Sequence, residues 1–219
     1  DGWLNGDRVW VDNASEAGWG VYTFNQPWLS SNERKLTEAQ TSQFGSSVKI
    51  STDNNFVFAG SPASNQVFAE PISSASTVTI TTRDAGGGKS IDSQGNVLSV
   101  ASNSNVYLYR QNGNVITALQ TIVSANLTGN VTSISMSADQ TWLYIGGNNA
   151  VHAYTANTTP SSANVSYVWA GKITGTGSFG NVVKTNTNGN VLFVGAPTAT
   201  NIYSQDGSVY VYSRSGNVL

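Results

Sequence analysis

The sequence predicts an all-β fold built from a repeated unit of about 45 residues, and three observations support this. First, FGSSVKISTDNNFVFAGSP at 44–62 and FGNVVKTNTNGNVLFVGAP at 179–197 agree at nine of nineteen positions without a gap. Second, weaker copies of the unit begin near residues 85 and 130. Third, apolar residues alternate with polar ones over short segments bounded by turn residues, whereas helical spacing never persists beyond a turn or two.

Each unit is expected to hold four antiparallel strands. In the last copy the first three strands are predicted at 181–185, 191–195 and 208–214, and Asn188-Gly189 supplies the positive φ of the first hairpin. A recurring valine and aromatic pattern marks the third strands, at 20–24, 66–70, 105–109, 150–154 and 208–212. The fourth strands are predicted at 28–36, 78–82, 116–123 and 167–173. Four strands in about 45 residues, repeated radially, predict a β-propeller whose blades pack on neighbours from both sides.

The blade boundaries follow from the repeat. One domain is predicted, with an incomplete blade over 1–43, whole blades over 44–84, 85–129 and 130–177, and an incomplete blade over 178–219. Two arrangements agree with an incomplete blade at each end of the chain. One is a five-bladed ring closed by a further strand, and the other, which we favour, is a segment of a longer propeller. The glycines of the two strong copies, Gly60 and Gly195, are predicted to be positions where neighbouring blades approach closely.

Composition excludes several classes of function. Charged residues make up only 10% of the chain and the net charge is −2, so a nucleic-acid partner is not expected. The chain lacks cysteine, which excludes thiol nucleophiles, disulfides and thiolate metal sites. No apolar stretch reaches the roughly 18 residues of a membrane span, so membrane insertion is not expected either.

The two strong copies resemble the FG-GAP repeats of integrin-α-type propellers. Phe44-Gly45 precedes Gly60-Ser61-Pro62 in the first copy, and Phe179-Gly180 precedes Gly195-Ala196-Pro197 in the second. The segments GVYTFNQPW at 20–28 and GSVYVYSRSGN at 207–217 look like the strand that follows in bacterial and viral members. More loosely, Val9-Trp10-Val11-Asp12 and Trp19-Gly20-Val21-Tyr22 resemble segments of bacteriophage tail and other virion proteins.

Many FG-GAP repeats carry a calcium loop between the first two strands. The equivalent turns here are 52–55, 92–95, 138–141 and 187–190, and each offers at most one carboxylate. Calcium prefers six to eight oxygen ligands, several of them charged, so no metal site and no cofactor are expected.

Neither histidine nor carboxylates indicate an enzyme. The single histidine, His152, occupies a position that holds tyrosine in sister repeats, which favours a packing role. Paired carboxylates remain conceivable, because glycosidases need two across a cleft. The candidates are interpreted as solvated carboxylates in or next to turns: Asp12, Glu16, Glu70, Asp84 and Asp206.

Aromatic residues and long loops supply the candidate binding residues. Trp142 and Trp169 lie in strand patterns and are expected in the core or between blades. Four tryptophans in the first 28 residues are expected to cover an open blade edge, the alternative being stacking on sugar rings or anchoring a partner. Two loops between second and third strands are longer than a turn requires. These two loops, at 12–18 and 197–207, and Trp19 directly after the first of them supply the predicted ligand-binding residues. The residues are Asn13, Glu16, Trp19, Asn201, Tyr203 and Asp206.

Together these observations predict a non-enzymatic virion structural or adhesion module of a phage tail, fibre or other exterior protein. Its expected partners are other virion proteins or a host-surface glycan or protein, as a homo-oligomer or as part of a longer chain. The alternative is a secreted or cell-surface bacterial adhesin or lectin with the same fold.

Overall fold

The computed structural model describes residues 8–12, 19–23, 43–72, 77–123, 125, 127, 130–160, 165–200 and 206–216. The chain divides into two compact units, Asp1–Thr37 and Glu38–Leu219. In the first unit, β1 (Arg8–Asp12) pairs with β2 (Trp19–Thr23) in an antiparallel hairpin. The predicted fourth strand at 28–36 lies outside the described residues.

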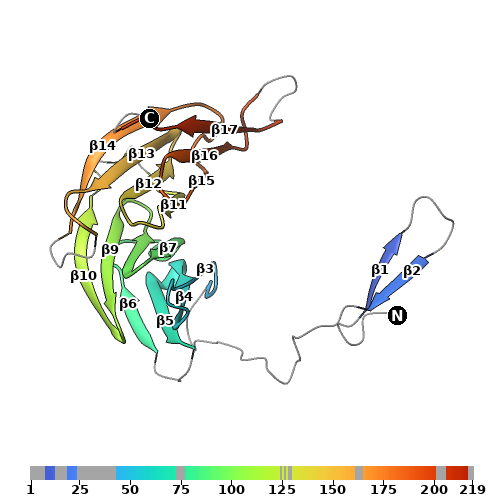
Figure 1. The fold of residues 1–219 in the computed structure, drawn as a ribbon, viewed down its shortest axis with the longest axis horizontal. Helices are drawn as coiled ribbons and strands as arrows, with labels where there is room; N and C mark the ends of the chain where they lie inside the picture. The colour runs from blue at the N-terminus through green and yellow to red at the C-terminus, as the bar shows by residue number, and fades with distance from the viewer. Residues whose placement is uncertain are drawn as a thin grey trace. The chain divides into compact units, whose positions relative to one another are not determined.

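The second unit consists of four consecutive antiparallel sheets, each with its strands hydrogen-bonded in chain order. The first three sheets have four strands and the last has three described strands, which confirms the predicted fold class of four-stranded antiparallel blades. Figure 1 shows the sheets following one another around an arc, with β3, β7, β11 and β15 on its inner side. The strands are β3 (Ser47–Ile50), β4 (Phe56–Ser61), β5 (Gln66–Pro71) and β6 (Val78–Thr81); β7 (Ser90–Gln94), β8 (Val97–Ala101), β9 (Val106–Asn112) and β10 (Val115–Ile122); β11 (Ser133–Met136), β12 (Trp142–Gly147), β13 (Ala150–Ala156) and β14 (Tyr167–Thr174); β15 (Val182–Thr185), β16 (Val191–Ala196) and β17 (Ser208–Ser213).

Nine strands of this unit have predicted bounds, and each of them begins and ends within three residues of the prediction. The hairpin between β15 and β16 turns at Gly189, whose φ of 69° confirms the turn predicted from Asn-Gly. One expectation about the turns is wrong. The alignment with calcium loops predicts Asp92 in a turn, but it lies inside β7, because the tight turn to β8 begins only at Gly95.

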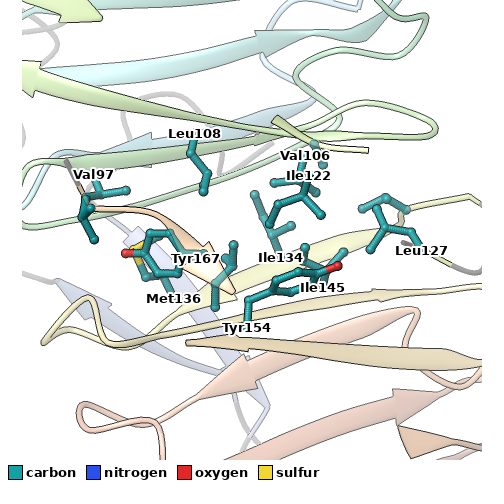
Figure 2. Packing of buried hydrophobic residues seen from close by; sticks show 14 residues of the cluster. Val97, Val106, Leu108, Ile122, Leu127, Ile134, Met136, Ile145, Tyr154 and Tyr167 are labelled. Carbon is teal, nitrogen blue, oxygen red and sulfur yellow. The ribbon is translucent and has the colours of Figure 1, made fainter. Parts of the chain in front are cut away.

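Apolar side chains fill the space between consecutive blades. Three buried clusters lie between the first and second, second and third, and third and fourth sheets. Figure 2 shows the middle cluster, in which Val97 and Leu108 of one blade face Ile134 and Ile145 of the next. Blades therefore bury both faces of their central strands, as the bulky residues on both faces predict.

Glycine permits the closest approach between blades. A Cβ added to Gly60 would lie 1.9 Å from the carbonyl oxygen of Gly88, which belongs to the loop that enters the next blade. Gly146 faces the carbonyl oxygen of Gly180 in the same way, at 2.2 Å. The prediction for Gly60 is confirmed, but the prediction for Gly195 is wrong in this structure: its nearest neighbours are atoms of Val182 at 3.6 Å or more. The reason is that none of the described sheets packs over the last blade.

Candidate functional site

A depression of about 550 Å³ lies where the outer strands of the second and third blades meet. Its lining comes from β10 and the loop after it, and from β13 and β14. Buried Ile122, Leu127 and Tyr154 belong both to this lining and to the core cluster of Figure 2. The depression therefore has a rigid apolar floor set by the packing of two blades.

Gln120 fixes one wall of this depression to the other. Its amide nitrogen donates to the carbonyl oxygen of Tyr167 at 2.9 Å, and its amide oxygen accepts from the Tyr167 backbone N–H at 2.6 Å. The Tyr167 hydroxyl donates to the Gln140 carbonyl oxygen at 2.7 Å, and burial raises the pKa of this phenol. Trp169 follows two residues later on the strand that these bonds hold, and its side chain is 61% exposed. The result is an exposed indole on a fixed backbone.

Polar groups line the same depression as this indole. His152, which is 5% exposed, and exposed Lys172 both line the depression. Burial, and then the charge of Lys172, lower the pKa of His152 below its usual 6.5, so the imidazole is neutral at pH 7. The site thus combines an aromatic platform, a neutral imidazole and an ammonium group, and none of its described lining residues is a carboxylate.

This site differs from the set predicted from the sequence. Asn13, Glu16, Asn201 and Tyr203 lie outside the described residues, and Trp19 begins β2 without a described side chain. Asp206 is exposed and lines another depression of about 620 Å³, on the last blade. The structure therefore does not test the predicted set as a group.

The two strand tryptophans have different environments. Trp142 is 4% exposed, as expected for a core residue, and the guanidinium carbon of Arg214 lies 3.9 Å from its ring centroid. Trp169 was also expected to be buried, and this is wrong. Trp142 lies on the second strand of its blade, between neighbouring sheets, whereas Trp169 lies on the outermost strand, where one face meets solvent. The signal that could have distinguished them is their strand position in the repeat.

Described carboxylates have structural partners. Asp92 is buried, forms an ion pair with Lys49 at 2.7 Å and accepts a hydrogen bond from the Met136 N–H at 2.7 Å. Asp84 accepts from the Tyr107 hydroxyl at 2.7 Å. Glu70, expected to be a solvated carboxylate, is instead 6% exposed and accepts from the Thr77 hydroxyl, because β5 carries it into the sheet.

The turns that align with calcium loops are closed by side chains. In the first blade the Ser51 hydroxyl donates to Asp53 at 2.5 Å and accepts from the Phe56 N–H at 2.9 Å. The third blade repeats these bonds with Ser137, Asp139 and the Trp142 N–H. Across the described part of the chain, no three His, Asp or Glu side chains are close enough to hold a metal ion. Within the same residues, no helix has the length and hydropathy needed to cross a membrane.

Comparisons with known proteins identify the fold. No protein-family profile matches the chain, and no curated protein matches its sequence significantly. Among solved structures, it resembles a candidate 6-phosphogluconolactonase from Bacteroides uniformis, with TM-score 0.60, 16% identity, and coverage of 78% of this chain and 50% of that one. Kuenenia stuttgartiensis hydrazine synthase matches with TM-score 0.60, 14% identity, and coverage of 83% and 49%. The Cps50 (Swd1) β-propeller domain of Myceliophteria thermophila matches with TM-score 0.58, 8% identity, and coverage of 77% and 52%.

At these identities the likeness concerns the fold alone. The chain spans about half the length of each matched structure. With four consecutive antiparallel blades, the second unit has the architecture of a β-propeller.

Proposed function

We propose that this chain is a non-enzymatic binding module of a virion exterior protein, and that it contacts a glycan on the host surface. The observation that carries the proposal is the 61% exposed Trp169 at the depression between the second and third blades. The resemblance of the two strong repeats to FG-GAP blades, and of the N-terminal segments to phage tail proteins, supports the virion context.

The chemistry of the depression suits a sugar. The face of an indole packs against the C–H face of a pyranose ring, while its edge stays hydrated. Lys172 can donate to hydroxyl or carboxylate oxygens of a saccharide. Hydrogen bonds already hold the platform in place, so binding would order few additional groups.

The role of the carboxylates supports a non-enzymatic interpretation. Glycoside hydrolysis needs two carboxyl groups within about 5–10 Å across the substrate. Asp84, Asp92 and Glu70 each serve a hydrogen bond or ion pair inside the fold, and none of them lines this depression.

Binding to an array of bacterial surface oligosaccharides tests the proposal. We expect Trp169→Ala to reduce binding of any recognised glycan by at least about tenfold, because it removes the stacking platform. Val168→Ala is the matched control, since Val168 precedes Trp169 on the same strand and is 47% exposed but does not line the depression. Equal binding by wild type and Trp169→Ala would reject the site, and turnover of a bound glycan would reject the non-enzymatic assignment.

A secreted or cell-surface bacterial adhesin is the second candidate, because the same depression would serve it equally well. The intact mass and peptide map of the native polypeptide distinguish the two. A long chain without a cleaved signal peptide supports the virion protein, whereas a short mature chain released from a signal peptide supports the adhesin.

A further inference from the structure

A β-bulge on β14 decides which side chains of this strand reach the depression between the second and third blades. Along the β13–β14 ladder the register shifts between Ala153 and Tyr154, and Ala170 of β14 is the extra residue. Side chains alternate between the two faces of a regular strand, so residues three positions apart would lie on opposite faces. The extra residue reverses this alternation, and it puts Trp169 and Lys172 on the same face.

Cross-strand pairing completes a group of four side chains on that face. Trp169 pairs with Tyr154, and Lys172 pairs with His152. The two β13 residues are two positions apart and therefore share a face, and residues directly opposite each other on a ladder share it too. All four line the same depression. Two residues of a strand span about 7 Å, so Trp169 and Lys172 arise from backbone positions about one sugar ring apart.

The bulge belongs to the repeat, but these two side chains do not. On the β9–β10 ladder of the second blade the register shifts in the same way, with Leu119 as the extra residue. There Ala118 occupies the position that Trp169 has in the third blade. Thr121 likewise occupies the position of Lys172. The fold of a blade thus provides the geometry, and the third blade adds an aromatic ring and a cation to it.

The two blades that form the depression hold few carboxylates. Residues 85–177 contain only Asp92 and Asp139 as acidic residues. Asp92 is buried on β7 and forms the ion pair with Lys49, and Asp139 lies in the turn before β12. Neither lines the depression, and the sequence of the loop at 123–129 holds no charged residue. The described lining therefore carries one positive charge and no negative one.

The positive charge of Lys172 acts inside the depression. Burial, and then this charge, lower the pKa of His152, and no carboxylate is among the causes of the shift. Because the imidazole is only 5% exposed, water and salt screen the interaction less than they would at an open surface. The chain as a whole has a net charge of −2, so attraction of an anion is a property of this depression rather than of the whole molecule.

We propose that this depression recognises a carboxylate-bearing sugar residue, such as a uronic acid, of a surface glycan. The inference rests on the proposed glycan binding and names the class of sugar. The pyranose ring packs on the Trp169 indole, and the carboxylate accepts a hydrogen bond from the Lys172 ammonium group. A single cation matches the single charge of a carboxylate, and the described lining holds none of the arginines that recognise phosphate groups through two parallel hydrogen bonds.

Calorimetric titration of the full chain with matched oligosaccharides tests the inference. The probes are glucuronate-, galacturonate- and sialate-terminated oligosaccharides, their carboxyl-reduced forms, and sulfated and phosphorylated analogues. We expect one of the acidic probes to bind at least about tenfold more tightly than its reduced form, because hydrogen bonds to charged groups are stronger than those to neutral ones. Raising the salt concentration should weaken binding of the acidic form and leave the reduced form unchanged.

Lysine variants separate the carboxylate contact from the general charge of the protein. Lys172→Met should bind the acidic and reduced forms equally, with the wild-type affinity for the reduced form, and Lys172→Arg should keep the preference for the acid. Lys184→Met is the matched control, because Lys184 is exposed on β15 and does not line the depression. It should keep the full preference. Thermal unfolding establishes that each variant is folded.

NMR titration of the single histidine gives a second readout. The chain holds one histidine, so His152 produces one set of imidazole signals. A carboxylate bound at Lys172 offsets the charge that helps to lower the pKa of His152. The pKa should therefore be higher with the acidic probe bound than with its reduced form bound.

The outcomes distinguish this inference from the proposed function. Equal binding of acidic and reduced forms, with both lost in Trp169→Ala, would overturn the inference and leave glycan binding in place. A preference for the acid that survives in Lys172→Met would also overturn it, because the anion would then be held elsewhere. Tighter binding of the sulfated or phosphorylated analogues would assign the depression to those anions instead. The absence of binding to every acidic and neutral glycan would reject the proposed function together with this inference.

Discussion

Replacing Gly60 with alanine should destabilise the fold through the contact between the first two blades. The new Cβ would lie 1.9 Å from the Gly88 carbonyl oxygen and 2.8 Å from its carbon. Both are backbone atoms, and Gly88 has φ of 90°, so the loop cannot yield by changing a side-chain rotamer. The blades must separate locally, and such overpacking costs about 1–3 kcal/mol. For a chain of this size, a loss of about 2 kcal/mol lowers Tm by about 4–8 °C.

Gly171→Ala is the matched control. Gly171 lies in β14, and no described atom comes within 4 Å of an added Cβ. Alanine there should be neutral or stabilising by up to about 1 kcal/mol, because glycine inside a strand loses more backbone entropy on folding. Urea and thermal unfolding of wild type and both variants measure the difference. Equal stability of Gly60→Ala and Gly171→Ala would refute the close approach of the blades at Gly60.

Two further predictions concern charged groups between and beside blades. Lys49→Met should destabilise by about 1–3 kcal/mol in urea unfolding because it leaves the buried Asp92 without its cation, whereas Lys184→Met should not lower stability. For His152, burial and Lys172 lower the folded pKa, so the unfolded chain gains a proton first as pH falls through 6.5. Stability is therefore full above that pH and declines below it. His152→Gln should remove this part of the decline, and an unchanged pH profile would contradict the assignment.

Local signals determine most of the strand pattern. Alternation of apolar and polar residues depends only on the pleat of a single strand, so the three strands of the last copy are readable from residues 181–214. The turn at Gly189 is likewise local, because Asn-Gly favours the backbone conformation of a tight hairpin. The repeat then extends these assignments to weaker copies and predicts the blades.

Which of two equivalent residues is buried depends on the tertiary structure. Gly60 and Gly195 occupy the same repeat position, yet only Gly60 meets another blade. Trp142 and Trp169 both fit strand patterns, but the position of each strand within its blade decides that one is 4% and the other 61% exposed. The candidate site also depends on the tertiary structure, because its lining comes from two blades that are separate segments of the sequence.

The sequence by itself therefore determined the unit, its period and its turns, which depend on neighbours a few residues apart. Only the tertiary structure decided which faces are covered and where Asp92 finds Lys49. The physical reason is that burial and electrostatic pairing arise between blades. Residues about 45 positions apart in the chain are brought together there by the stacking of sheets.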